Sequence, residues 1–155
     1  MANIVFNIAA GRVVELYNRV ESNDPTNSAL IRVPIETTGL EADATLIDAD
    51  TLAAVLAGTT SEQTTMGRKT LTDADLAALP APDDTNNRYE VSLPTVTWTA
   101  ASGNAISKIL VCYDSDTTAG TDANSVPLTM FDFAQTPSGA DIQMTTGVFF
   151  RATPA

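Results

Sequence analysis

The pattern of hydrophobic and polar positions predicts different structures for the two parts of the chain. Up to residue 87, helical spacing and helix-capping signals surround one strand pattern, whereas from residue 88 onward nearly every apolar segment is typical of a strand. We therefore expect a mainly β fold with short helices, in the α+β class. Its N-terminal half should be helical, and its C-terminal half an antiparallel β-sandwich or a barrel-like sheet.

The first predicted helix covers residues 8–20. One face carries apolar residues at the i, i+3, i+4, i+7 spacing of a helix, namely Val13, Leu16, Tyr17 and Val20. Asn7 is expected to cap its start, and Asn23 to Pro25 to end it. Packing of the apolar face in the core of the chain is favoured over a dedicated docking helix, although the apolar start at residues 4–6 points to a tethered terminus.

Two further helices are expected before residue 88. Residues 51–58 follow acidic cap candidates and end at Gly58, and residues 72–79 start at the cap Thr72 and stop at Pro80. The Thr-rich segment between them, residues 59–68, is polar and is predicted to be an exposed loop. Residues 80–87 are rich in Pro, Asp and Asn and are expected to form a hinge between the two halves of the chain.

Strand patterns begin with residues 28–38, where Pro34 predicts an edge strand or a break. The later strands are expected at residues 88–93, 95–99, 105–113, 126–133 and 147–151, with 105–113 in the centre because it is apolar on both faces. These elements divide the chain into residues 1–27 as a possible docking arm, 28–87, and 88–155. Together they are expected to form one compact domain.

The amino-acid composition excludes several kinds of catalytic site and binding partner. The 155 residues include 19 Asp and Glu, eight Lys and Arg, and no His, for a formal charge of −11. Without His, the common metal ligand and the usual neutral-pH base are missing, so most familiar catalytic constellations are excluded. The charge opposes nucleic acid as a partner, because binding depends on Lys and Arg neutralising phosphates. No export signal or membrane-spanning apolar stretch is expected.

The sequence gives only weak evidence for a reactive thiol, a metal site or a catalytic carboxylate pair. Cys112 sits in an apolar strand pattern and is predicted to be a buried thiol, not a reactive one. The segment 114–122 begins like a calcium loop, but Ala119 and Ser125 stand where that loop requires Gly and Glu. We therefore expect no metal and no cofactor. Many Asp and Glu pairs are compatible with a glycosidase, and the sequence does not rank them.

Several segments resemble small structural proteins of tailed bacteriophages. The resemblance lies in the sequences LPTVTWT (93–99), KILVCYD (108–114), DFAQTPSGAD (132–141) and GVFFR (147–151), and in the middle of the chain in DTLAAVLAG (50–58) and RKTL (68–71). The resemblance covers about two thirds of the chain, and its motifs are turns and core strands. The resemblance implies a component of the virion, assembled in the host cytoplasm, and does not specify which one.

The favoured function is therefore a non-enzymatic capsid decoration or cement protein. Its expected partners are the major capsid protein, or another virion protein, and further copies of the same chain; its negative charge suits the outside of the head. The expected contact residues are Ile4, Val5, Phe6, Val13, Leu16 and Tyr17. The alternative is a head-fibre or tail-tip module that recognises a host surface through loops 59–68 and 114–124. A carbohydrate-active enzyme is a distant third.

Overall fold

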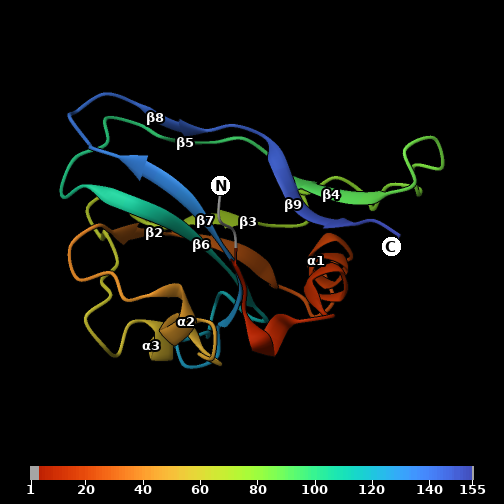
Figure 1. The fold of residues 1–155 in the computed structure, drawn as a ribbon, viewed down its shortest axis with the longest axis horizontal. Helices are drawn as coiled ribbons and strands as arrows, with labels where there is room; N and C mark the ends of the chain where they lie inside the picture. Colours follow the sequence, from red (N-terminus) through yellow and green to blue (C-terminus); the bar gives the residue numbers. More distant parts are fainter. Residues whose placement is uncertain (1–3, 155) are drawn as a thin grey trace.

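The structure, a computed structural model, describes residues 4–154 and is mainly β (Figure 1). The helical elements are the 3₁₀ helix η1 (Asn7–Ala9), α1 (Val13–Glu21), α2 (Asp43–Leu46) and α3 (Leu52–Val55). The strands are β1 (Ile4–Val5), β2 (Ala29–Glu36), β3 (Lys69–Leu71), β4 (Tyr89–Leu93), β5 (Val96–Trp98), β6 (Ile106–Asp114), β7 (Val126–Gln135), β8 (Ile142–Met144) and β9 (Gly147–Ala152).

Five strands form the main antiparallel sheet, in the order β1-β7-β6-β2-β3. Two smaller antiparallel ribbons, β4 with β9 and β5 with β8, lie over one face of this sheet (Figure 1). Helix α1 packs on the same face, and α2 and α3 cover the opposite face. The main sheet is therefore enclosed between two sets of elements.

The central strands have buried residues on both faces. In β2, Leu30 belongs to the cluster beneath α1 and the β4–β9 ribbon, whereas its neighbour Ile31 belongs to the cluster beneath α2 and α3. The same alternation holds in β6, where Val111 and Cys112 face opposite clusters. Successive strand residues point to opposite faces, so apolar residues at consecutive positions are needed where both faces are covered.

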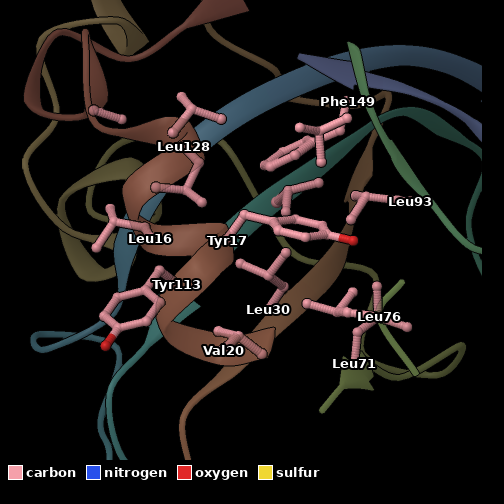
Figure 2. Packing of buried hydrophobic residues seen from close by; sticks show 14 of the residues in the cluster. Leu16, Tyr17, Val20, Leu30, Leu71, Leu76, Leu93, Tyr113, Leu128 and Phe149 are labelled. Atoms are coloured by element: carbon pink, nitrogen blue, oxygen red, sulfur yellow. The ribbon is translucent and has the colours of Figure 1, made fainter. Parts of the chain in front are cut away.

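Helix α1 packs by the apolar face that its spacing predicts. Leu16, Tyr17 and Val20 belong to the same buried cluster as Leu30 of β2 (Figure 2), and all four are at most 2% exposed. The Tyr17 ring lies 6.3 Å from that of Phe149, and its hydroxyl donates a 2.7 Å hydrogen bond to the Ala77 carbonyl. The interpretation of this helix as a core-packing element is confirmed.

The expectation of a helical N-terminal half is wrong, because its helices are short and one of them is absent. The first helix begins at Val13, not at residue 8, because Gly11 adopts φ 79° and interrupts it after η1. Helix α3 is capped by Thr51, whose side chain accepts from Ala54 N, and not by an aspartate. The helix expected at residues 72–79 is absent: residues 73–75 form a turn, and the Asp75 carboxylate accepts from the backbone and hydroxyl of Thr72.

The strand predictions fare better. β6 is the middle strand of the five, as expected. The expectation of an edge strand or a break at Pro34 is wrong, because β2 lies between β6 and β3 and is continuous from Ala29 to Glu36. The Pro34 carbonyl accepts from Gln63 N, and the pairing of β2 with β3 ends earlier, at Arg32. Proline is tolerated there because no β3 residue needs its missing N–H. Strands β1, β3 and β8 were not anticipated; all are two or three residues long, too short to show periodicity.

The five-stranded sheet draws strands from all three predicted segments: β1 from residues 1–27, β2 and β3 from 28–87, and β6 and β7 from 88–155. The predicted segment boundaries therefore do not divide the hydrogen-bonded sheet. All three sheets are open, so the finer expectation of a sandwich or a barrel stays a prediction.

Replacing Leu16 by Ala is expected to lower the free energy of unfolding by about 2–5 kcal/mol, because the side chain leaves a cavity beneath α1. Asn18→Ala, on the exposed face of the same helix, should change it by less than about 0.5 kcal/mol. Urea denaturation followed by circular dichroism measures both. Equal effects of the two substitutions would contradict the packing described for α1.

Candidate functional site

The N-terminal strand β1 forms one edge of the main sheet. Ile4 pairs with Met130 and Val5 with Thr129 of β7, and the backbone N–H of Phe6 donates to the Leu128 carbonyl at 3.0 Å. The Val5 side chain is 41% exposed, an unusual position for a large apolar residue in this chain. An edge strand with an exposed apolar side chain is suited to contact with another chain.

The six predicted contact residues do not share one surface. Phe6, Val13, Leu16 and Tyr17 are at most 2% exposed and belong to the core of the chain. Ile4 is half-buried against the cluster beneath α2 and α3, and only Val5 is exposed. In this conformation a partner can reach Ile4 and Val5, so the predicted contact narrows to β1 and stays a prediction.

Loop 59–68 is not the simple exposed loop that its polarity predicts, because Thr60 and Gln63 are buried. The Gln63 amide donates to the carbonyls of Ser102 and Asn104, at 3.4 and 3.1 Å, and accepts from the backbone of Thr65 at 2.7 Å. A buried amide with these partners holds a loop in place. The Thr-rich composition gave no indication of this role.

Arg68 joins loop 59–68 to loop 114–124, the two loops that would recognise a host surface in the alternative function. Its guanidinium contacts Glu62 at 2.5 Å and Asp122 of the second loop at 2.6 Å. These hydrogen bonds raise the pKa of Arg68 and lower the pKa of Asp122. The preceding residue, Gly67, accepts a 2.9 Å hydrogen bond from the Trp98 indole. The loops are thus fixed to each other and to β5.

At the start of loop 114–124, the acidic side chains accept hydrogen bonds from the loop itself. The Asp114 side chain, 5% exposed, accepts from Asp116 N at 3.0 Å, and a Cβ at Gly120 would meet its carboxylate at 2.4 Å. Asp116 in turn accepts from the backbone and hydroxyl of Thr118. Among residues 4–154, no group of three His, Cys, Asp or Glu side chains is arranged to hold a metal.

Cys112 is fully buried in β6, which confirms the prediction of a buried thiol. Burial raises its pKa far above the ordinary range, so the nucleophilic thiolate is disfavoured at neutral pH. Within the described part of the chain, no helix is long and apolar enough to cross a membrane.

Arg32 is the residue that the sequence pattern misplaces. The period-two pattern of residues 28–38 assigns it to the polar face of a half-buried strand, yet it is 1% exposed. It lies on the same face of β2 as Leu30 and borders a cavity of about 330 Å³ between the main sheet and the segment that joins β8 to β9. The apolar residues on either side of it, Ile31 and Val33, were the signal in the sequence that could have indicated its burial.

The Arg32 guanidinium has one hydrogen-bond partner for its three nitrogens. Nη2 donates to the Pro94 carbonyl at 2.9 Å, whereas Nε and Nη1 have none. Burial lowers the pKa of Arg32 to about 10, so the group is still a cation at neutral pH. A desolvated positive charge therefore lies beside the cavity, with Nε and Nη1 closed to solvent.

Comparison with protein-family models, curated proteins and solved structures found no match to the chain. No family is therefore assigned, and the functional arguments depend on the features of the chain itself. Three of these features bear on function. The β1 edge can contact another chain, loops 59–68 and 114–124 are held together by Arg68, and the cavity beside Arg32 is large enough for a small molecule.

Because the folded state lowers the pKa of Asp122, its pairing with Arg68 stabilises the protein above the ordinary aspartate pKa of about 3.9 and loses this effect as the pH falls through the lower folded value. Asp122→Asn is expected to cost about 0.5–1 kcal/mol at pH 7, since the pair is partly exposed, and less at pH 3. The control is Asp73→Asn at an exposed turn. Urea midpoints at both pH values measure the difference; a cost independent of pH would contradict the assignment.

Proposed function

We propose that the chain is a non-enzymatic structural protein of a tailed-phage virion, a decoration or cement protein that binds the outside of the head and bridges neighbouring major capsid subunits. The observation that carries the proposal is the exposed edge strand β1, where Val5 extends the main sheet at its outer side. A capsid strand added beside it would gain backbone hydrogen bonds, and Val5 would lose its contact with water.

The rest of the molecule suits a role as a rigid body. Arg68 fixes the two long polar loops together, and Gln63 anchors one of them to the β5–β6 turn. The formal charge of −11 favours a position outside the head, away from packaged DNA. We interpret the main sheet and its two covering ribbons as the two layers of a sandwich-like body.

Stabilisation of the capsid would follow from mass action. A protein that binds assembled subunits, and not free ones, favours the assembled lattice by the free energy of binding. This requires no catalytic group, so the absence of His from the sequence is compatible with the role. Oligomerisation of the chain itself would place several β1 edges on neighbouring capsomers.

The proposal is tested by sedimentation of the purified chain with DNA-free heads and complete particles of the phage that encodes it. We expect the chain to sediment with both, and Val5→Asp to weaken binding at least tenfold, because a charge at the edge strand must be desolvated. Immunogold electron microscopy of the same particles locates the bound chain on the head.

Val148→Asp is the matched control, because Val148 is a similarly exposed valine, at 38%, on the separate ribbon strand β9. This variant should bind heads as the wild type does. Loss of binding in Val148→Asp alone would overturn the assignment of the contact to β1. Binding to host cells, without binding to heads, would overturn the decoration role and favour the head-fibre or tail-tip alternative.

A further inference from the structure

Arg32 is a buried cation whose charge is not balanced at its own site. Within the described residues, Nε and Nη1 of its guanidinium have no hydrogen-bond partner, and Nη2 donates to the neutral carbonyl of Pro94. Burying an ionised group in such surroundings is unfavourable unless an opposite charge approaches it. Proteins rarely maintain this arrangement without a use for the charge.

The acidic residue that borders the cavity does not supply the missing balance. Asp132 contacts the Lys108 ammonium at 3.1 Å, and Lys108 also pairs with Asp43 at 2.8 Å on the face covered by α2. Burial alone accounts for the lowered pKa of Arg32, whereas an adjacent carboxylate would raise it. Among residues 4–154, no carboxylate forms an ion pair with the Arg32 guanidinium.

The cavity around Arg32 has the composition of a small-molecule site. Its volume of about 330 Å³ is at the lower end of the range for such sites. Most of its wall is apolar, formed by Leu93, Phe131, Phe133, Met144, Val148 and Phe149. Gln143, Thr145 and Thr146 add polar groups, and Val148 and its neighbours on the β8–β9 segment are exposed, so this wall also faces solvent.

We infer that this cavity binds a small amphipathic monocarboxylate. Its carboxylate would accept hydrogen bonds from Arg32 Nε and Nη1, which are closed to solvent in the unbound protein, so binding requires the side chains beside them to move. Its apolar body would contact Phe131 and Phe149. Arginine is suited to this task because its planar fork matches the two oxygens of a carboxylate. A single charge is preferred because the net charge of −11 repels multiply charged anions such as phosphates more strongly.

A purely structural role for Arg32 makes a different prediction. If the residue serves only to bind Pro94 O, its replacement by Met loses that bond and weakens the protein. If it is instead maintained for a ligand, Met of similar length removes an unbalanced buried charge and leaves the unbound protein at least as stable. The inference holds whether or not the chain belongs to a virion.

The test uses the full chain and two probes, octanoate and 4-phenylbutyrate, each compared with its neutral amide by isothermal titration calorimetry. At least one acid should bind with a dissociation constant below about 1 mM, at least tenfold more tightly than its amide. Arg32→Met should reduce the affinity for the acid to that for the amide, with an unchanged or higher melting temperature. In nuclear magnetic resonance spectra, the Arg32 Nε–H signal should shift with the acid only.

Val148→Trp provides a second variant that does not alter the buried charge. Its larger side chain, at a partly exposed position on the cavity wall, should fold normally and lower acid binding at least tenfold. The inference is overturned if neither acid binds the wild type, if acid and amide bind equally, or if Val148→Trp binds as the wild type does. A fall in melting temperature for Arg32→Met, with no acid binding, would assign Arg32 a structural role.

Discussion

The pairing of β2 with β6 is the interaction on which the rest of the structure depends. These strands pair from Ala29 to Glu36 and from Ile106 to Asp114, and nearly every residue of both is buried. A sheet centre that is apolar on both sides must be covered on both sides. Helix α1 and the two ribbons meet this requirement on one face, and α2 and α3 meet it on the other. The arrangement of every other element follows from that need.

The sequence predicts this centre well because long apolar strands carry a strong local signal. The position of β6 and the packing face of α1 both follow from the spacing of their apolar residues. The errors lie where one side chain decides the local structure. Gly11 delays the first helix, and Asp75 bonds back to Thr72 and turns a helix-like segment into a turn. The periodicity of apolar residues carries no information about the effect of one glycine or one side-chain hydrogen bond.

The candidate site was less predictable than the fold, because burial depends on distant elements. Arg32 reads as a surface residue until the β8–β9 segment, more than a hundred residues later in the chain, is seen to cover it. Gln63 and Arg68 likewise gain their roles from Asn104 and Asp122. Conversely, the apolar residues chosen for docking were mostly required by the core, and Val5 alone of the six is left exposed. Apolar periodicity does not distinguish an internal partner from an external one.

The order of strands in the sheet also has a consequence for synthesis of the protein. β2 is complete by residue 36, yet its principal partner β6 begins at residue 106, and the β7 strand that pairs with β1 follows later still. A chain emerging from the ribosome therefore carries β2 without its partner while residues 37–105 are translated. Such non-local pairing slows folding and leaves apolar strands accessible to other chains. The central sheet can form only after residue 135 has been translated, so β1 and β2 must wait for strands that lie about a hundred residues later in the chain.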